Sequence, residues 1–512
     1  MSRTCPTQRL SRKRKLLPCS ETEVNSASLL MGKRRPRLDG AAAAVTAKTT
    51  RAQSTLGALE RLPSEMLVQL FDCSDYEALA KTALLSTRTR SLVRRYLTGC
   101  RARDRFLDET DEWLAQCPCA PCVQVQACYG SVFTAWGRLF KLVTCLEPTA
   151  ERLEFLKAFY TRVSEKRSFF RHLADDADWL HGWGELLMAF VDKWEFAENG
   201  RAFDEVLGLE GAYFRTKLEQ LLTSLEEERL PSAERRSAEA ENAFAVRQFC
   251  RLVFLDHRFK DARDGPFWLT KLLDCQPAAE RRGRLLYILY APVLAGRQVR
   301  MPSPASGPRN AAVFVRQNPS IDWKSVCDFP VTDYADFCRR VQPLSRALES
   351  LARLSVPTAN RRSYDFQWTE SQLFQLVEET TTYPEPWALD NFTALFYNAP
   401  QLARIALISR IRVGIVEECG VVLNGLKTLA YRWRDEAEGP MARVRNTVDE
   451  VFSALGSVAL KRALYKEIVL AHSRKLVELA DDASQLGRRD AAEELDSYAV
   501  FTHCLRPIRS TF

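Results

Sequence analysis

The stretch from Leu59 to Ser86 reads LERLPSEMLVQLFDCSDYEALAKTALLS and carries the punctuation of two consecutive helices. Pro63 suits the first turn of a helix, where its missing N–H leaves no hydrogen bond unmade, and Glu65 complements the positive end of the helix dipole. Apolar residues then recur at the three- and four-residue spacing of a helix, at Leu67, Leu70 and Phe71. The stretch therefore predicts a helix that begins near residue 63.

Two further short helices follow in the same segment. Ser74-Asp75-Tyr76-Glu77 has the S-x-x-E pattern of a capping box, which opens a helix. Ser86 can cap a third helix and Gly99 can end it. Apolar residues keep helical spacing throughout, at Tyr76, Leu79, Ala80, Ala83 and Leu84, and then at Leu92, Val93, Tyr96 and Leu97. We therefore expect a three-helix unit within residues 56–100.

The rest of the chain is also patterned as helices. Apolar residues recur at helical spacing in Val132–Leu146, Ala150–Val163, Trp179–Phe196, Tyr213–Glu228, Ala243–Phe254, Trp268–Leu273, Arg281–Tyr290, Pro343–Leu354, Thr369–Glu379, Gln401–Ile411, Gly414–Trp433, Met441–Leu455, Leu460–Leu479 and Ala491–Leu505. Strand-like alternation is scarce, with Ala311–Val315 and Cys419–Val422 as the nearest cases. The fold class is predicted to be all-α, with a large irregular helical domain. No strict repeat is visible, so a regular solenoid is not established, although solenoid-like stacking of helix pairs stays open.

Loops divide the predicted helices into domains. We expect loops at Glu226–Glu241 and at Thr380–Pro386, and a longer stretch rich in Pro, Gly and Ser at Leu294–Val331. The predicted organisation is a disordered basic tail at 1–55, a three-helix unit at 56–100, a first helical part at 101–293, a loop-rich insertion at 294–331 and a second helical part at 332–512. Six tryptophans at helical spacing with leucines are expected in the core: Trp179, Trp183, Trp194, Trp268, Trp387 and Trp433.

The charge of the chain is concentrated in its tail. The 512 residues have a formal net charge of +8, but residues 1–61 hold 13 Lys and Arg against 4 Asp and Glu, a balance of +9. Residues 62–512 hold 60 basic and 61 acidic residues, a balance of −1. The folded body is therefore close to neutral, and a direct nucleic-acid partner is not required. With 46% hydrophobic residues, the body has enough apolar side chains for a sizeable core.

The tail has two basic clusters and little aromatic content, which is typical of disorder. One cluster consists of Arg12, Lys13, Arg14 and Lys15, and the other of Lys33, Arg34, Arg35 and Arg37. Such clusters indicate a nuclear import signal, with a nucleic-acid-contacting or merely solubilising tail as the alternatives. We expect a nuclear protein with some of it in the cytoplasm.

Membrane, secretion and metal signals are weak. No uninterrupted apolar run of about 20 residues is present, and the first 20 residues lack the apolar core of a secretory signal. The 15 cysteines are scattered, which fits reduced thiols in cytosol or nucleus. Four cysteines close in sequence could hold a tetrahedral zinc, although free thiols in a proline-bearing loop are the favoured interpretation: Cys117, Cys119, Cys122 and Cys128.

Motifs of enzyme chemistry are not found. The sequence has no phosphate-binding glycine loop, no G-x-S-x-G and no H-E-x-x-H. Asp256-His257 suggests an acid–base pair, but neighbouring residues on a helix do not face each other, so a hydrogen-bonded or surface histidine is expected. We therefore predict neither a catalytic residue nor a cofactor.

Residues 59–97 resemble an F-box. Its pattern is L-P-x-E followed by two apolar residues, an acidic turn, a leucine-bearing helix and a final basic and apolar helix, and Leu62 to Leu97 follow it. The remainder is similar to the F-box only protein 47 family. The segments that carry this resemblance are Arg138–Leu142 with Glu147–Leu153, Phe249–His257, Pro266–Thr270, Arg284–Ile288 and Trp368–Asn391.

The resemblance implies a non-catalytic adaptor of a Skp1–cullin–F-box ubiquitin ligase. Its partners would be Skp1 and, through Skp1, cullin-1 and a RING subunit, with an unknown protein substrate held by the helical body. The Skp1-binding residues would be Leu62, Pro63, Glu65, Leu67, Leu70, Phe71, Leu79, Leu84 and Leu85. The resemblance also implies a role in the germline nucleus in meiotic prophase, in homologue synapsis or telomere maintenance.

Two alternatives stay open at this point. Cys73 stands where the F-box has a leucine, and Thr87–Arg90 lack the frequent aromatic residue. A helical scaffold of meiotic chromosomes, with a degenerate or Skp1-only F-box, is therefore the rival function. At the level of packing, the apolar residues of the three-helix unit could instead pack against the chain's own helical body.

Overall fold

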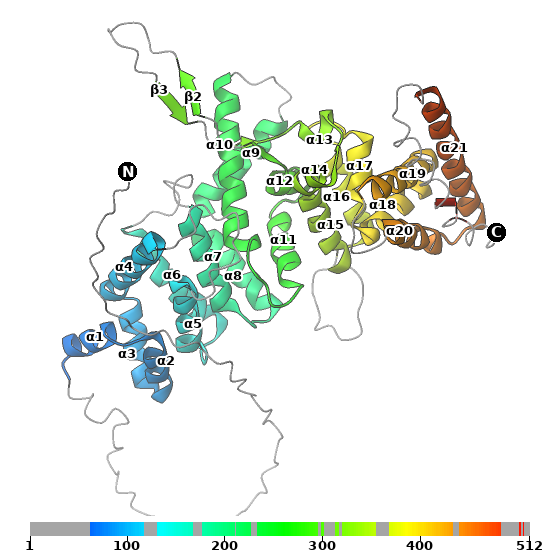
Figure 1. The fold of residues 1–512 in the computed structure, drawn as a ribbon. Helices are drawn as coiled ribbons and strands as arrows, with labels where there is room; N and C mark the ends of the chain where they lie inside the picture. The colour runs from blue at the N-terminus through cyan, green and yellow to red at the C-terminus, as the bar shows by residue number, and fades with distance from the viewer. Residues whose placement is uncertain are drawn as a thin grey trace, which may run out of the picture. The chain divides into compact units, whose positions relative to one another are not determined.

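A computed structural model describes residues 62–116, 131–166, 177–209, 211–226, 233–294, 298–301, 313–316, 320–354, 368–433 and 440–482, together with 501, 502 and 505. All described residues belong to one compact unit, Thr55–Phe512. Helices account for nearly all of its regular structure (Figure 1), so the predicted all-α class is confirmed.

Two of the first four helices, α2 and α3, begin at capping side chains. The four helices are α1 (Ser64–Asp72), α2 (Tyr76–Leu85), α3 (Thr87–Leu97) and α4 (Cys100–Gln116). Ser86 caps α3 in a reciprocal capping box with Thr89, as expected. The cap of α2 is Asp75, whose Oδ1 accepts the Ala78 N–H at 2.6 Å, because Ser74 turns its hydroxyl back to the Leu70 carbonyl of α1. Pro63 precedes α1 and does not form part of its first turn.

The middle of the chain is a run of longer helices. They are α5 (Val132–Thr144), α6 (Thr149–Ser164), α7 (Ala177–Val191), α8 (Phe196–Leu209), α9 (Gly211–Glu226), α10 (Ala233–Cys250), a π-helical continuation at Arg251–Leu255, α11 (Asp264–Asp274) and α12 (Ala279–Tyr290). The expected single helix Trp179–Phe196 is wrong, since α7 ends at Val191 and Lys193 takes a left-handed φ of 64°.

The expected loop at Glu226–Glu241 is also wrong in its second half. Helix α10 begins at Ala233, inside that stretch. The sequence from Ala233 to Glu241 is rich in alanine, glutamate and arginine, which have high helix propensity but form no apolar stripe. The pattern that identified the other helices was therefore missing there.

Short antiparallel strands lie in the stretch expected to be rich in loops. Strand β1 (Val293–Leu294) pairs with β4 (Ser320–Ile321), and β2 (Gln298–Met301) pairs with β3 (Val313–Arg316). Strand β3 overlaps the strand-like alternation noted at Ala311–Val315, whereas Cys419–Val422 lies inside a helix.

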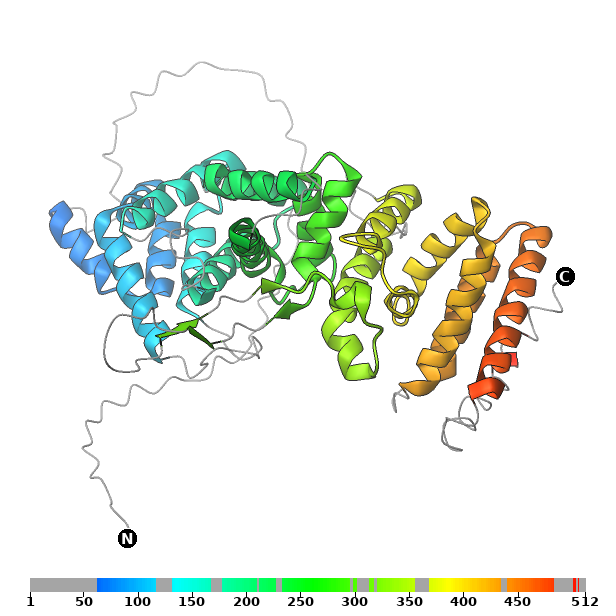
Figure 2. The same cartoon turned by 90° about the horizontal axis from the view of Figure 1, so that it is seen from above.

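The remaining helices follow these strands in the chain. They are α13 (Ser325–Asp328), α14 (Tyr334–Arg340), α15 (Gln342–Leu354), α16 (Glu370–Thr381), α17 (Leu389–Leu395), α18 (Pro400–Arg412), α19 (Val416–Arg432), α20 (Pro440–Ala454) and α21 (Val458–Asp482). Helix α19 packs against α20 and α21, and Figure 2 shows these helices lying alongside one another in yellow to red. A Cβ at Gly420 of α19 would stand 2.8 Å from the backbone of Glu467 in α21, so glycine permits this close packing.

One hydrophobic core runs through the described residues from α1 to the last helices. The six tryptophans predicted to be in the core are all buried, which confirms that prediction. Phe106 forms the centre of an aromatic cluster, with edge-on contacts to Phe133, Trp136, Phe159 and Trp179 at ring separations of 5.2–5.7 Å. A second aromatic cluster joins Phe337 to Tyr397 and Trp433.

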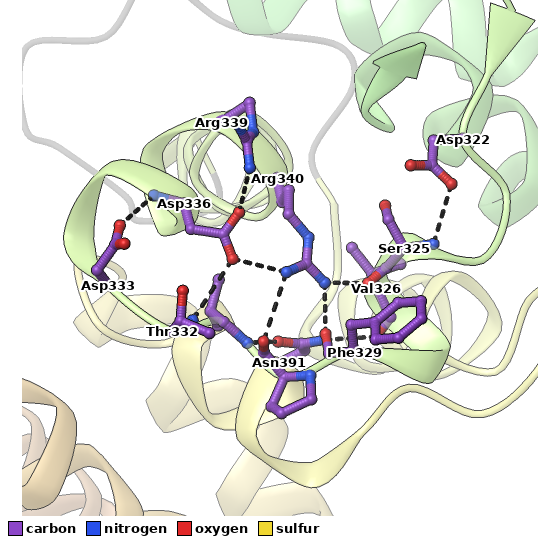
Figure 3. A network of polar contacts seen from close by, with 12 residues as sticks. Asp322, Ser325, Val326, Phe329, Thr332, Asp333, Asp336, Arg339, Arg340 and Asn391 are labelled. Atoms are coloured by element: carbon purple, nitrogen blue, oxygen red, sulfur yellow. Dashed lines mark hydrogen bonds and ion pairs between the residues drawn. The ribbon is translucent and has the colours of Figure 1, made fainter.

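A buried polar network holds the turn after α13 against α14 and α17 (Figure 3). Arg340 pairs with Asp336 at 2.6 Å and also donates to the carbonyls of Ser325 and Phe329. Asn391 of α17 donates to the Val326 and Phe329 carbonyls at 2.6 and 2.8 Å. Because these buried groups bond to one another, the irregular turn between α13 and α14 has a defined path.

Candidate partner-binding surface on the first helices

Four large apolar side chains of α1 and α2 point into solvent. Their exposed fractions are 52% for Met66, 42% for Leu70, 49% for Leu84 and 66% for Leu85. We call these four residues the exposed apolar set. Met66 and Leu70 are four residues apart and so share one face of α1. Such side chains have no chemistry of their own, but they are the kind that a protein partner buries.

The structure places the nine residues expected to bind Skp1 in three environments. Pro63, Glu65, Leu70, Leu84 and Leu85 are exposed, and Leu62 and Leu67 are half-buried. Phe71 and Leu79 are different, because they lie in the chain's own core and are only 5% and 1% exposed. They lie on the inner side of α1 and α2, which the following helices cover, and their contact with a partner stays a prediction. Met66, an apolar position of the F-box pattern, was missing from the expected residues.

A shared carboxylate joins the three-helix unit to the body. Glu109 of α4 accepts hydrogen bonds from the Tyr76 hydroxyl at 2.5 Å and from the Trp136 indole N–H at 3.0 Å, both through Oε2. Its Oε1 pairs with Arg105 Nε at 2.8 Å. Side chains of α2, α4 and α5 therefore meet at one residue. No local sequence signal indicated this junction, because Trp136 and Tyr76 lie 27 and 33 positions away from Glu109.

Arg105 extends this junction to α1. Its Nη1 donates to the Phe71 carbonyl at 3.0 Å, and its guanidinium lies 5.4 Å from the centre of the Tyr76 ring. Nearby, the Tyr96 hydroxyl of α3 donates to Asp72 Oδ1 at 2.7 Å. Burial, followed by the hydrogen bond to Glu109, raises the pKa of Tyr76, so this hydroxyl stays a donor at neutral pH.

A second contact fixes α3. Arg94 pairs with Glu147 at 2.8 Å, donates to the Glu151 carbonyl and lies 5.7 Å from the centre of the Phe155 ring. The three helices are therefore attached to α4, α5 and α6 through several buried or half-buried contacts. These contacts hold the exposed apolar set in a fixed position relative to α4, α5 and α6, which we call the fixed base.

The Asp256-His257 pair is not an acid–base site. Asp256 pairs with Arg251 at 2.8 Å, and His257 Nε2 lies 3.1 Å from the Val253 carbonyl oxygen. Burial, with the neighbouring His181, lowers the pKa of His257 to about 4, so its ring is neutral at physiological pH. The expected hydrogen-bonded histidine is confirmed.

Several expected sites fall outside the described residues. They are the basic clusters Arg12–Lys15 and Lys33–Arg37 and the cysteines Cys117, Cys119, Cys122 and Cys128. Among the residues that the structure does describe, no group of three or more His, Cys, Asp and Glu side chains could hold a metal ion. No described helix is both long enough and apolar enough to span a membrane.

Comparison with known proteins finds one family model and two curated relatives, all with the same family name. A family model described as "FBXO47, ARM repeats" matches residues 312–508, which contain α13 to α21. Armadillo repeats are stacks of helices, in agreement with the packing of α18 to α21. No solved structure matches the chain.

Two curated relatives carry the same family name. F-box only protein 47 from Homo sapiens is 22% identical over 338 residues, and that from Mus musculus is 24% identical over 338 residues. Each match covers 66% of this chain and 63% of the relative, so the matched region spans less than two thirds of those proteins. The family model and the relatives agree with each other and with the F-box pattern at residues 59–97. The chain is therefore similar to the F-box only protein 47 family, both in residues 312–508 and over the 338 residues matched by its relatives.

Proposed function

We propose that this chain is the substrate-recognition subunit of a Skp1–cullin-1–F-box ubiquitin ligase. Helices α1 to α3 bind Skp1, and the helices that follow hold a target protein. The observation that carries the proposal is the exposed apolar set on α1 and α2, within an F-box sequence pattern. Burying one such side chain is worth about 1.5–3 kcal/mol, so four of them are sufficient anchors for a partner.

The chain acts in this complex by proximity alone. A RING subunit, held by cullin-1, brings the enzyme that carries ubiquitin, and this chain holds the target beside it. Holding two reactants together raises their effective concentration, which accelerates transfer without a catalytic residue in this chain. The fixed base formed by Glu109 and Arg94 suits such a role, because a bound partner keeps a constant orientation to α4–α6.

We place this activity in the nucleus of germline cells in meiotic prophase, in homologue synapsis or telomere maintenance, with some of the protein in the cytoplasm. The two basic clusters within residues 1–55 and the family resemblance support this placement. A chain lacking residues 1–55 should remain cytoplasmic when it is expressed in cells. Nuclear staining equal to that of the full chain would contradict the import signal.

The rival function is a helical scaffold of meiotic chromosomes with a degenerate or Skp1-only F-box. Cys73 favours it, because an exposed cysteine ends α1 at a position where the F-box has a leucine. The two functions differ in one respect that can be measured, which is whether cullin-1 accompanies Skp1.

Co-purification from cells tests both. The full chain should recover Skp1 and cullin-1, and Leu70→Ala/Leu85→Ala should recover at least about tenfold less of each, because it truncates two exposed anchors. Leu146→Ala is the matched control, since Leu146 is 69% exposed but lies outside α1–α3. Failure of the full chain to recover Skp1 would overturn the proposal, and Skp1 without cullin-1 would support the scaffold.

A further inference from the structure

Helix α21 packs chiefly on α19 and lies at the outer end of the row of helices drawn in yellow to red in Figure 2. One side of it is apolar and buried in the core, at Leu464, Ile468 and Ala471. A helix at the end of a repeat stack usually turns a polar side to solvent, because no further repeat covers it. The outer side of α21 departs from this rule.

Exposed apolar side chains lie on the side of α21 opposite its buried stripe. Leu470 is 37% exposed and Val477 is 62% exposed, and Val469 beside them is 41% exposed. Leu470 and Val477 belong to a line of four exposed residues at spacings of four, three and four, which we call the outer seam: Lys466, Leu470, Ser473 and Val477. Spacing of this kind lets one helix pack along the whole length of a second helix.

The charges of α21 are divided between its two ends. Its first nine residues, 458–466, contain three cations and no anion, and its last five, 478–482, contain three anions and no cation. This distribution is unfavourable within one helix, because the helix dipole is positive at its N-terminal end and negative at its C-terminal end. A second helix that runs in the opposite direction places an anionic end beside each cationic start, so both ends gain a partner of opposite charge.

Two cations at the start of α21 are available for such a contact. Lys466 is exposed and Lys461 is half-buried, and neither forms an ion pair with a residue that the structure describes. Arg474, nearer the middle of the helix, is different because it is paired with Glu417 of α19 at 2.6 Å. The charge that an incoming partner meets at the start of α21 is therefore positive.

We propose that two copies of this chain associate through α21, with the two helices antiparallel about a two-fold axis. The outer seam is symmetric about the point midway between Leu470 and Ser473. Antiparallel pairing therefore sets Leu470 against Ser473 of the second copy, and the aliphatic stem of Lys466 against Val477. The Ser473 hydroxyl donates to the Val469 carbonyl of its own helix at 2.9 Å, so covering it leaves no donor unpaired.

The ends of the helices fit in the same register. Lys461 of one copy faces Asp482 of the other, and Lys466 reaches the turn that contains Glu478. Because the axis is two-fold, each of these pairings occurs twice. A second copy is therefore the partner that matches both the apolar middle and the charged ends of α21.

The size of the contact sets its strength. A helix of 25 residues is about 38 Å long and about 10 Å wide, so its outer side is smaller than the about 800 Å² per partner of a standard interface. We therefore expect a Kd in the micromolar range. Two copies joined in this way carry two sets of α1–α3 and two helical bodies, which raises the effective concentration for any partner with two binding sites. This association does not depend on the proposed ligase function.

Sedimentation of the purified full chain at about 0.15 M salt tests the proposal. We expect the mean mass to rise from that of one chain toward that of two chains between about 0.1 and about 50 µM. Leu470→Lys/Val477→Lys should weaken association at least about tenfold, because it removes the apolar part of the outer seam and brings like charges together. Leu142→Lys/Leu146→Lys is the matched control, since these leucines are 42% and 69% exposed and lie outside α21.

Paired charge reversals make the test specific to the ends of α21. Lys461→Glu/Lys466→Glu makes both ends of the helix anionic, and Glu478→Lys/Asp482→Lys makes both ends cationic. Each variant alone should associate at least about tenfold more weakly than the original chain, because like charges then meet. An equimolar mixture of the two variants should recover the original strength, since opposite charges meet again. A variant that had merely lost its fold would not recover on mixing.

Three results overturn the proposal: the mass of one chain at every concentration, equal weakening in Leu142→Lys/Leu146→Lys, or no recovery in the mixture. Association through the exposed apolar set would also contradict it. Leu70→Ala/Leu85→Ala should therefore associate as strongly as the original chain, and a loss in that variant would assign the contact to α1 and α2.

Discussion

Glu109 joins three helices, because its one carboxylate accepts hydrogen bonds from side chains of α2, α4 and α5. We expect Glu109→Ala to lower the free energy of unfolding by about 2 kcal/mol, since it leaves the Tyr76 hydroxyl and the Trp136 N–H without an acceptor. Urea unfolding followed by tryptophan fluorescence measures the change. The control is Asp108→Ala, an exposed neighbour on α4, which should change stability by less than about 0.5 kcal/mol. Equal losses in the two variants would contradict the role of the junction.

His257 links stability to pH. Its pKa is about 4 in the folded chain and about 6.5 when exposed, so between these values the unfolded state binds more protons. Stability therefore falls as the pH is lowered from about 6.5 toward 4, and His257 should account for about 2 kcal/mol between about pH 7 and pH 5.

The variant His257→Gln separates this effect from other groups. Burial lowers the pKa of His472 to about 4 in the same way, whereas burial raises the pKa of Asp264 to about 6, which has the opposite effect on stability. Glutamine keeps a donor for the Val253 carbonyl but does not titrate. The difference in urea midpoint between pH 7 and pH 5 should be smaller in the variant than in the original chain. An unchanged pH dependence would show that His257 is not the linked group.

At the residue scale, the sequence predicts only in part which apolar side chains of α1 and α2 are buried and which are exposed. Spacing shows that Leu67, Phe71 and Leu79 are on apolar stripes, but a stripe does not show which part of it a later helix covers. Phe71 meets Tyr96 at a ring separation of 5.6 Å, and this contact depends on how α1 and α3 cross. The exposure of Leu470 on α21 was not predictable for the same reason, since its spacing does not show that the described helices leave it uncovered.

Helix crossings depend on small residues where two backbones approach. Gly420 lets α19 pack against α21, and a Cβ there would stand 2.8 Å from the backbone of Glu467. We expect Gly420→Ala to destabilise the chain by about 1–3 kcal/mol, because the gain in helix propensity is smaller than the cost of separating two packed helices.

A second glycine gives the matched comparison with the opposite sign. Gly208 lies in α8 with nothing within 4 Å of an added Cβ, so Gly208→Ala should stabilise the chain by about 0.5–1 kcal/mol. The thermal unfolding midpoints of both variants, measured by circular dichroism, should move in opposite directions. A stabilised Gly420→Ala would mean that α19 and α21 do not pack closely in solution.

At the element scale, helices with an apolar stripe were predictable to within a few residues. Pro343–Leu354, Gln401–Ile411 and Met441–Leu455 correspond to α15, α18 and α20. The two errors in helix boundaries each have a physical cause. Helix α10 starts in an alanine- and charge-rich stretch without a stripe, and the break after α7 depends on the left-handed Lys193, a conformation that lysine rarely adopts.

The described helices share one hydrophobic core, so the three-helix unit is not expected to fold alone. Leu79 is 1% exposed in the full chain, and Tyr76 depends on Glu109 and Trp136 from later helices. A fragment of residues 56–100 also has too few residues to bury a stable core. Circular dichroism of the purified fragment should show little helix and no cooperative thermal transition. A sharp transition would show that α1–α3 form an independent domain.

The exposed apolar set has a consequence for the amount of free chain that a cell can hold. Met66, Leu70, Leu84 and Leu85 remain in water on the uncombined molecule, and uncovered apolar side chains favour self-association. Any molecule that covers them also removes this tendency by mass action. A molecule made in excess of its binding partner keeps these side chains exposed and is therefore subject to quality control and degradation. The steady-state level of this protein should therefore follow the supply of whatever covers these four side chains.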